Sequence, residues 1–209
     1  MASVITVGVV EQQPKRGNAD DARPLDPTRV LRRVYRAALR SYERALHPRR
    51  HLTLSLRLKN QPRPQRILVI CHGNICRSPY LQAVLQRDLP DVAVTSAGFV
   101  GSGRPAPQVS VAVCIQRGLD LSRHRSQPIT RSKVAAADLV IVMDAEQARR
   151  VAGRFRASPD RIVIAGDLDP KFDTSRSIRD PWKESADVFR ESFDRLDRCA
   201  DNLVRLLKG

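Results

Sequence analysis

The sequence predicts an α/β fold, with one domain over about residues 66–209 and a basic N-terminal extension before it. Beyond residue 66, short apolar runs alternate with segments of helical periodicity, which is typical of a domain with a parallel sheet. The charge balance also changes at this point. Residues 1–66 hold 15 Lys or Arg against 5 Asp or Glu, and the rest of the chain holds 22 against 17. Most of the net charge of +15 therefore belongs to the extension.

Four runs of aliphatic and β-branched residues have the length and composition of strands buried in a sheet. The first run, residues 67–70, is continuous and leads directly into Cys71. The other three predicted strands are residues 92–95, 139–143 and 161–164.

Segments of helical periodicity follow these runs. The last segment is the clearest, because eight apolar residues fall on one face of a helix near the C-terminus. Ser78 as an N-cap and Pro79 at the first helical position predict where the first of these helices begins. The predicted helices are residues 79–89, 107–118, 144–155 and 186–207.

The segment that joins the first strand to its helix reads Cys71-His-Gly-Asn-Ile-Cys-Arg77-Ser-Pro79. It places a thiol just before a helix N-terminus, where backbone N–H groups and the helix dipole favour a bound dianion and the thiolate form of Cys71. Arg77 presents a planar guanidinium group that can bind two phosphoryl oxygens and stabilise the charge of a transition state. We interpret the segment as a phosphate-binding loop that carries its own nucleophile.

The remaining residues of this loop are candidate substrate-binding residues. Gly73 allows close backbone approach or a positive φ angle, and Asn74 readily adopts left-handed backbone while its amide ties the loop together. Ser78 can donate a hydrogen bond to the sulfur of Cys71. The candidate substrate-binding residues are His72, Gly73, Asn74, Ile75, Cys76, Ser78 and Trp182.

Two other interpretations of the loop fit less well. A free cysteine at a strand end is often only a small buried residue. The preceding strand, the Gly-Asn pair and the Ser-Pro helix start together favour a functional loop instead. A Walker A phosphate loop would need Gly-Lys-Ser or Gly-Lys-Thr, and the segment contains neither.

Residues 71–79 resemble the signature of the low-molecular-weight protein tyrosine phosphatases. The resemblance covers about residue 66 to the C-terminus and nothing before it. It implies a four-stranded parallel sheet with helices on both faces, a phosphocysteine intermediate, and no metal or organic cofactor. Further segments that match the family in order and approximate spacing are residues 95–98, 118–126, 137–144 and 180–182.

The resemblance also implies a general acid for the leaving phenolate oxygen, placed in an Asp-Pro pair that precedes an aromatic residue near the C-terminal helix. Two Asp-Pro pairs compete for this role. Asp180 is the predicted acid, because Trp182 follows its proline and can line the cleft against an aryl ring. Pro181 restricts Asp180 to extended backbone. Asp169 lacks the aromatic neighbour and is interpreted as a turn residue.

The four cysteines have different expected roles. Cys76 lies five residues after Cys71, and the resemblance implies a reversible disulfide that protects the nucleophile from higher oxidation. A small buried residue is an equally open interpretation of Cys76. Cys114 and Cys199 fall in helical patterns and are expected to be inert. Four cysteines without a secretory or transmembrane segment predict no disulfide framework, and the chain is expected to be cytoplasmic.

Three positions bear on the surroundings of the loop. Ser96 and His124 match positions that in the family hydrogen-bond the loop asparagine, although ordinary turn and surface roles stay open. His72 departs from the family, which more often has an aliphatic or small residue there. Its side chain faces either the rim of the cleft or solvent, and solvent is slightly favoured. Phe99 lies near the cleft wall over residues 99–105, but its orientation cannot be read from the sequence.

The extension divides into three parts. Residues 1–25 mix Pro, Gly, Gln and charges without a period, and we predict that they are disordered. Residues 26–46 place apolar side chains at helical spacing, with arginines mostly elsewhere, which predicts a basic amphipathic helix that ends before Pro48. Four leucines over residues 52–58 alternate with polar residues, which indicates a strand at an added sheet edge. Residues 26–65 thus form the predicted extension, and residues 66–209 the predicted phosphatase domain.

Three roles of the extension stay open. It packs on the phosphatase domain, which is slightly preferred, lies on an anionic membrane surface, or binds a protein partner or an anionic polymer. Nucleic acid is not expected as a partner, because the basic residues are not interleaved with stacking aromatic residues. The expected location is therefore the cytoplasm, with the inner face of the membrane as an open alternative.

The expected function is hydrolysis of aryl phosphate monoesters on a tyrosine-phosphorylated protein. Arsenate reduction by the same fold is one alternative, but it needs resolving cysteines, commonly a close pair, and Cys114 and Cys199 are far apart in the sequence. The other alternative is a catalytically weak phosphate-binding scaffold that acts through the basic extension. The complete set of Cys71, Arg77 and Asp180 disfavours it.

Overall fold

The computed structural model describes residues 27–171 and 175–208, and the tail predicted over residues 1–25 lies outside them. The chain divides into two units, residues 1–36 and residues 37–209. The described part of the first unit is the start of the helix α1 (Pro27–Asn60). In this part of α1, the large apolar side chains of Leu31, Val34 and Tyr35 are exposed.

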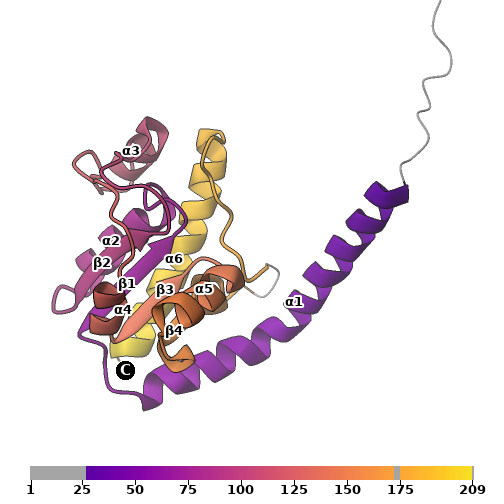
Figure 1. The fold of residues 1–209 in the computed structure, drawn as a ribbon, viewed down its shortest axis with the longest axis horizontal. Coiled ribbons are helices and arrows are strands. Elements are labelled where there is room, and N and C mark those ends of the chain that lie inside the picture. The colour runs from indigo at the N-terminus through magenta and orange to yellow at the C-terminus, as the bar shows by residue number, and fades with distance from the viewer. Residues whose placement is uncertain (1–26, 172–174, 209) are drawn as a thin grey trace, which may run out of the picture. The chain divides into compact units, whose positions relative to one another are not determined.

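The second unit is built on a four-stranded parallel sheet in the order β2-β1-β3-β4, with helices on both faces (Figure 1). This confirms the predicted fold class. The strands are β1 (Arg66–Cys71), β2 (Ala93–Gly98), β3 (Leu139–Val142) and β4 (Ile162–Ile164). Strand β2 ends later than the sequence predicted, because its second half pairs with the end of β1, where Cys71 lies opposite Gly98.

Side chains that alternate along β1 divide the interior into two layers. Ile67 and Val69 belong to the larger core, with α2, α3 and α6, whereas Leu68 and Ile70 belong to the core with α4 and α5. Alternation of this kind places successive side chains on opposite faces of a sheet. The helices are α2 (Arg77–Asp88), α3 (Gln108–Ile115), α4 (Arg131–Ala136), α5 (Ala145–Phe155) and α6 (Ala186–Lys208). Two short 3-10 turns, η1 (Pro159–Arg161) and η2 (Ala165–Leu168), flank β4.

The predicted capping role of Ser78 is wrong. Helix α2 begins at Arg77, its N-cap residue is Cys76, and no side chain caps it. The hydroxyl of Ser78 is used elsewhere, because it donates a hydrogen bond to the sulfur of Cys71 over 3.0 Å. Pro79 stays inside the first turn, where a missing N–H leaves no intrahelical hydrogen bond unmade.

The predicted strand over residues 52–58 is also wrong, and so is the helix end before Pro48. Helix α1 contains Pro48 and continues to Asn60. Leu54 and Leu58 are buried in the larger core, whereas Leu52 and Leu56 are exposed. Residues four apart share one face of a helix, so the alternating leucines suit a helix as well as a strand. None of the described helices has the length and apolarity needed to cross a membrane.

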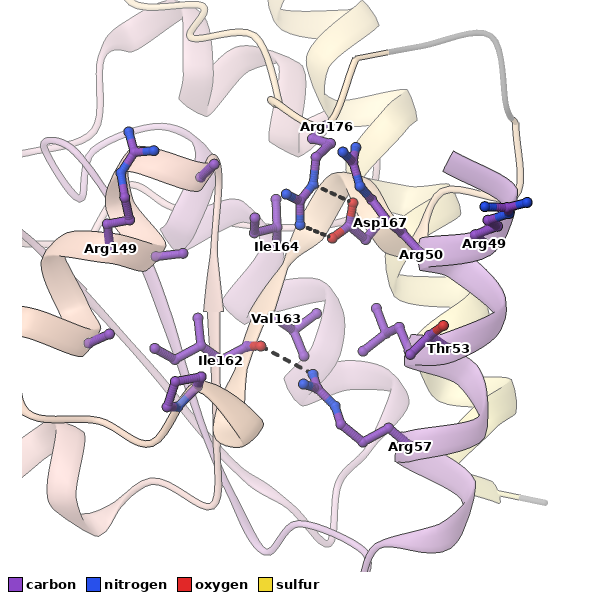
Figure 2. A pocket seen from close by; sticks show the side chains of 15 residues that line it. Arg49, Arg50, Thr53, Arg57, Arg149, Ile162, Val163, Ile164, Asp167 and Arg176 are labelled. Carbon is purple, nitrogen blue, oxygen red and sulfur yellow. Dashed lines mark hydrogen bonds and ion pairs between the residues drawn. The ribbon is translucent and has the colours of Figure 1, made fainter. Parts of the chain in front are cut away.

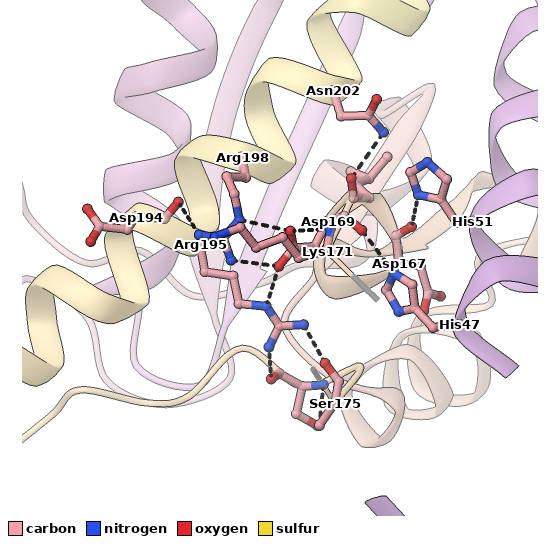
Figure 3. A network of polar contacts seen from close by, with 12 residues as sticks. His47, His51, Asp167, Asp169, Lys171, Ser175, Asp194, Arg195, Arg198 and Asn202 are labelled. Atoms are coloured by element: carbon pink, nitrogen blue, oxygen red, sulfur yellow. Dashed lines mark hydrogen bonds and ion pairs between the residues drawn. The ribbon is translucent and has the colours of Figure 1, made fainter. Parts of the chain in front are cut away.

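Polar contacts fix the second half of α1 to the end of the sheet. Nε2 of His47, which is fully buried, donates to the carbonyl oxygen of Asp169 over 2.9 Å. One turn later, Nδ1 of His51 donates to the carbonyl oxygen of Asp167 over 3.0 Å (Figure 3). Arg57 donates to the carbonyl oxygen of Ile162 at the edge of β4. These contacts and the buried leucines outweigh the roughly 3 kcal/mol cost of a proline inside a helix.

Candidate active site

Cys71 ends β1 at the carboxyl edge of the sheet, and its side chain is almost fully buried. Two donors point at its sulfur. The backbone N–H of Asn74 lies 3.2 Å from Sγ, and Oγ of Ser78 lies 3.0 Å from it. Donors that converge on one sulfur stabilise negative charge there. The sulfur of Cys71 is therefore held at the focus of two hydrogen-bond donors of the loop.

Asn74 holds the loop in shape. Its backbone φ angle is +50°, in the left-handed region that the sequence predicted for it. Its side-chain amide donates to the hydroxyl oxygens of Ser78 and Ser96 over 2.9 and 2.8 Å, and Oδ1 accepts from the N–H of Gln127 over 2.8 Å. Nε2 of His124 donates to the carbonyl oxygen of Asn74 over 2.7 Å. The contacts expected of Ser96 and His124 are thus present.

Burial lowers the pKa of His124 below its ordinary value of 6.5, although the hydrogen bond to Asn74 opposes this shift. A neutral imidazole is sufficient for the contact, because it needs only one N–H at Nε2. His124 therefore supports the loop without adding a full positive charge to it.

Arg77 lies under the loop with only 4% of its surface exposed. Nη1 donates to the carbonyl oxygen of Ile178 over 3.0 Å, and Nη2 forms an ion pair with the carboxylate of Asp180. Ile178 and Asp180 are thereby fixed beside the helix that follows the loop. Two predicted site residues that are far apart in the sequence, Arg77 and Asp180, are in direct contact.

A small cavity of about 110 Å³ opens above Cys71. Of the predicted residues, Asn74, Arg77 and Ser78 are buried and do not line it. Val100 and Arg104 form one wall of the cavity, within the segment 99–105 that was expected to form it, although the sequence did not single out these two residues. Its lining is Cys71, His72, Gly73, Ile75, Cys76, Val100, Arg104, Asp180 and Trp182.

The cavity wall also settles two orientations that the sequence left open. His72 lines the cavity and is exposed at the same time, so it lies at the rim. Phe99 does not line the cavity, because its ring packs near the ring of Phe155 and under the guanidinium group of Arg150. The cleft-wall segment instead contributes Arg104, which donates to the carbonyl oxygens of Gly73 and Val100. The sequence did offer a signal for Arg104, because it is a basic residue within the segment 99–105 that was expected to form the wall.

Asp169, the other aspartate of an Asp-Pro pair, does not line this cavity. Its side chain has no exposed surface and accepts hydrogen bonds from Arg195 and Arg198 at 2.9 to 3.0 Å (Figure 3). One carboxylate oxygen also accepts from the N–H of Lys171, two residues on, as the turn interpretation predicted. Burial alone would raise the pKa of Asp169, but the hydrogen bonds and the charges of the arginines hold it below its ordinary value. Asp169 is a structural anion.

All four cysteines are free thiols, and all are buried. Burial raises the pKa of Cys76 well above its ordinary value, and the charge of the Cys71 thiolate adds to this shift. Burial likewise raises the pKa of Cys114 to about 12 and that of Cys199 beyond its ordinary range. Cys114 and Cys199 are therefore poor nucleophiles, in agreement with the inert role expected of them.

A thiol with converging donors, a buried guanidinium group and a carboxyl group at the carboxyl edge of a parallel sheet are the parts of a cysteine-dependent phosphate-ester hydrolase. The family model described as low molecular weight phosphotyrosine protein phosphatase matches residues 66–209, and the chain belongs to this family.

Curated relatives and solved structures agree with this assignment. A probable low molecular weight protein-tyrosine-phosphatase, EpsP from Ralstonia nicotianae, is 40% identical over 144 residues, which are 68% of this chain and 96% of the relative. Wzb from Escherichia coli K12, a low molecular weight protein-tyrosine-phosphatase, is 32% identical over 68% of this chain and 95% of its own. The Erwinia amylovora tyrosine phosphatase AmsI aligns with a TM-score of 0.65 at 28% identity, over 70% of this chain and 95% of its own.

Another solved relative is the arginine phosphatase YwlE from Geobacillus stearothermophilus. It aligns with a TM-score of 0.63 at 30% identity and covers 69% of this chain and 94% of its own. The solved structures that resemble this chain are thus named for two activities, tyrosine phosphatase and arginine phosphatase.

Proposed function

We propose that the protein hydrolyses phosphotyrosine in a protein substrate by two successive transfers of the phosphoryl group. The sulfur of Cys71 attacks phosphorus and forms a phosphocysteine, while the tyrosine oxygen leaves and takes a proton from Asp180. Water then attacks the phosphocysteine, and inorganic phosphate and the thiolate of Cys71 are released. The observation that carries this proposal is that Cys71 and Asp180 line one cavity, while the buried Arg77 forms an ion pair with Asp180 beside it.

The loop supplies the stabilisation that the first transfer requires. Charge on the transferring group spreads over its three equatorial oxygens, where backbone N–H groups and a guanidinium fork can meet it. Arg77 is oriented for this by its hydrogen bond to Ile178. The donors from Asn74 and Ser78 stabilise the sulfur again when it leaves in the second transfer.

The ion pair between Arg77 and Asp180 implies that substrate binds before Asp180 acts as the acid. A phosphoryl group bound by Arg77 competes with the carboxylate for the same Nη2 donor. Released from Arg77, the carboxyl group can carry a proton to the phenolic oxygen. The N–H of Trp182 donates to Oδ1 of Asp180 over 3.3 Å and limits how far the released side chain moves.

The walls of the cavity fit an aromatic leaving group. Ile75, Val100 and Trp182 offer apolar surface next to Cys71, and aromatic side chains favour packing of this kind. His72 and Arg104 stand beside them at the rim and favour acidic residues next to the phosphotyrosine. No metal or organic cofactor has a part in this mechanism.

The test compares matched variants of the full-length protein. Wild-type protein should hydrolyse an aryl phosphate and a phosphotyrosine peptide without added metal, and Cys71→Ser should abolish turnover but still bind vanadate. Cys199→Ala, which removes a buried thiol that lines neither cavity, is the control and should keep turnover. Acid quenching during turnover should trap phosphate on the peptide that contains Cys71. Turnover in Cys71→Ser would contradict the mechanism, and preference for a phosphoarginine peptide would contradict the substrate.

The two alternative functions have less support. An arsenate reductase needs a second thiol that can reach Cys71 through a mobile segment, and Cys114 and Cys199 have no exposed surface. A scaffold without catalysis has no use for a carboxyl group held beside the phosphate-binding loop. Reduction of arsenate by wild-type protein, measured beside aryl phosphate hydrolysis, distinguishes these functions from the proposed one.

We infer, as a second proposal, that α1 brings this cytoplasmic enzyme to an anionic membrane surface. A free nucleophilic thiol is typical of a reducing compartment. In the second unit, Tyr42, Leu52 and Leu56 of α1 are more than half exposed, and the N-terminal 66 residues carry most of the net positive charge. Exposed apolar residues combined with positive charge are typical of helices that lie in the membrane interface.

Co-sedimentation with vesicles tests the membrane proposal. The protein should bind vesicles that contain anionic lipid, and binding should weaken as added salt screens the charges. Leu52→Ser with Leu56→Ser should reduce binding, whereas the same change at Ala38, already small and exposed, is the control. Self-association of the full-length chain without vesicle binding would show that a second copy covers these residues instead.

A further inference from the structure

A second, larger cavity of about 670 Å³ lies beside the second half of α1 (Figure 2). Its other walls are the edge strand β4 and the helix α5. It shares no lining residue with the cavity above Cys71. Its volume is within the roughly 300–1,000 Å³ that is usual for small-molecule sites. One wall belongs to α1, which lies outside the residues that match the phosphatase family. The cavity is therefore a feature that the extension adds to the domain.

The cavity is strongly positive. Among the residues that the structure describes, the lining holds one carboxylate, that of Asp167, and both of its oxygens are bound by Arg176 at 2.6 and 2.9 Å. No other carboxylate among the described lining residues neutralises the charge of the remaining arginines. The lining arginines are Arg49, Arg50, Arg57, Arg149 and Arg176.

Two of these arginines keep hydrogen-bond donors without acceptors. Nη1 of Arg50 and Nε of Arg57 are shielded from solvent and have no partner among the described residues. Arg57 uses one Nη2 contact to the carbonyl oxygen of Ile162, which points the rest of its guanidinium group along the cavity. Figure 2 shows Arg50 and Arg57 extending from α1 toward the strand, with Arg149 on the opposite side. A buried donor without an acceptor is destabilising, and an anionic ligand would supply the missing acceptor.

The floor between these arginines is apolar and made of small side chains. Ala145, Ala148 and Ala152 lie on α5 and leave space that larger residues would fill. Ile162 and Ile164 continue the floor along β4. An inorganic anion would contact the arginines and leave this floor in water. The chemistry of the cavity thus matches a ligand with an anionic group and an apolar body.

We propose that this cavity binds a small organic phosphate, with the phosphate between Arg50 and Arg57 and the apolar part on the alanine floor. Guanidinium groups bind phosphate in bidentate geometry, and they stay charged at every physiological pH. A soluble nucleotide and a membrane lipid phosphate share this chemistry, and the experiment below distinguishes them. Binding here is independent of the proposed phosphatase chemistry, because neither Cys71 nor Arg77 takes part.

The test uses full-length Cys71→Ser protein, which prevents hydrolysis of the ligands during the measurement. Adenosine diphosphate, uridine diphosphate, a short-chain phosphatidic acid and inorganic phosphate are titrated while backbone amide resonances are recorded by NMR. Organic phosphates should shift amides over residues 145–152 and 162–164. Binding at the catalytic loop shifts residues 72–78 instead, so the two sites are resolved in one spectrum.

Two arginine variants distinguish binding at this cavity from general attraction of anions to a basic protein. Arg50→Gln removes a guanidinium group that makes no hydrogen bond to described residues, so folding should be preserved and affinity should fall at least about tenfold. Arg123→Ala, an exposed arginine of another loop, is the control and should not change affinity.

Each outcome decides the proposal. Saturable nucleotide binding that weakens in Arg50→Gln supports a soluble ligand, and binding of phosphatidic acid alone supports a lipid source. Equal affinity for inorganic phosphate would overturn the proposal, because the apolar floor would then contribute nothing. Shifts confined to residues 72–78, or equal losses in Arg50→Gln and Arg123→Ala, would overturn it as well.

Discussion

Two aspartates followed by proline have opposite surroundings in this protein. Asp169 has no exposed side-chain surface and is bound by two arginines, whereas the side chain of Asp180 is 44% exposed at the cavity above Cys71. A general acid must reach the leaving oxygen, which requires an accessible and movable carboxyl group. Exposure next to the nucleophile, and not the Asp-Pro pair as such, distinguishes the two residues.

Asp180→Asn should lower kcat at least about tenfold on a poor phenolic leaving group and much less on a good one, because only the poor leaving group needs the proton. The ratio of the two rates measures this effect directly and does not depend on the fraction of folded protein. Asp169→Asn is the matched control, and its ratio should equal that of the wild type. The reverse pattern would assign the acid to Asp169.

Asp169→Asn should lower the free energy of unfolding by about 3 kcal/mol, since it leaves Arg195 and Arg198 without their buried anion. Chemical denaturation at neutral pH measures this loss. Asp180→Asn should change stability much less, because its ion pair is half exposed and screened by solvent. Equal stabilities of Asp169→Asn and wild type would contradict the structural role.

His124 should make the stability of the protein depend on pH in the mildly acidic range. Its pKa is below 6.5 in the folded protein, whereas the unfolded chain has the ordinary value. Below pH 6.5 the unfolded state binds the proton more readily, so stability should decrease as the pH falls through this range. Melting curves between pH 7.5 and about pH 5 should show a flatter profile in His124→Gln, which can still donate to the carbonyl oxygen of Asn74. An identical slope in both proteins would exclude His124 as the cause.

At the scale of elements, the four strands could be predicted because each strand is marked by an apolar run within its own segment. The four apolar runs became the four strands, and the loop between Cys71 and Arg77 formed where the first strand met the next helix. The candidate site could be predicted for a similar reason, since the residues of the loop and Asp180 carry distinct chemistry at distinct positions. The wall segment over residues 99–105 was expected, but which of its side chains face the cavity could not be predicted, because the orientation of Arg104 depends on its contact with Gly73 in the folded protein.

The errors lie where tertiary contacts outweigh local rules. Ser78 has the composition of an N-cap but hydrogen-bonds Cys71 instead. Pro48 and the alternating leucines favoured a helix end and a strand, but burial of Leu54 and Leu58 continues the helix. Helix α4, with six residues, is too short for its periodicity to be recognised.

Gly98 should tolerate no side chain, because it lies where β2 meets the phosphate-binding loop. A Cβ atom at this position would lie 2.8 Å from the backbone nitrogen of Asn74 and 2.9 Å from the carbonyl carbon of Gly73. Backbone atoms cannot move aside as the end of a flexible side chain can. Gly98→Ala should therefore cost about 1–3 kcal/mol of stability and lower kcat by displacing the loop.

The matched control for Gly98 is Gly153→Ala on α5, where an added Cβ meets nothing within 4 Å. Alanine favours the helix by roughly 1 kcal/mol over glycine, so this variant should be at least as stable as the wild type and equally active. Denaturation curves and steady-state rates on an aryl phosphate check both variants. Full activity in Gly98→Ala would show that the loop tolerates the displacement.

At the scale of the whole molecule, the second half of α1 is part of the larger core. Leu54 and Leu58 are 7% and 5% exposed and belong to the same core as Ile67 and Val69 of β1. Full burial of a leucine is worth about 1.5–3 kcal/mol. The reported relatives align over 68–70% of this chain while 94–96% of their own length is covered, so the domain can fold without this helix in the family.

Two truncations should therefore have different consequences. Removing residues 1–36 deletes only the first unit and should leave the melting temperature unchanged. Removing residues 1–64 also exposes the core surface under Leu54 and Leu58 and should lower the melting temperature by several degrees, while kcat on an aryl phosphate is kept. The second truncation should in addition lose the organic phosphate cavity, because its α1 wall is gone. Equal melting temperatures for the two truncated proteins would show that α1 contributes nothing to the stability of the domain, and loss of kcat in the second alone would show that the extension supports the catalytic loop.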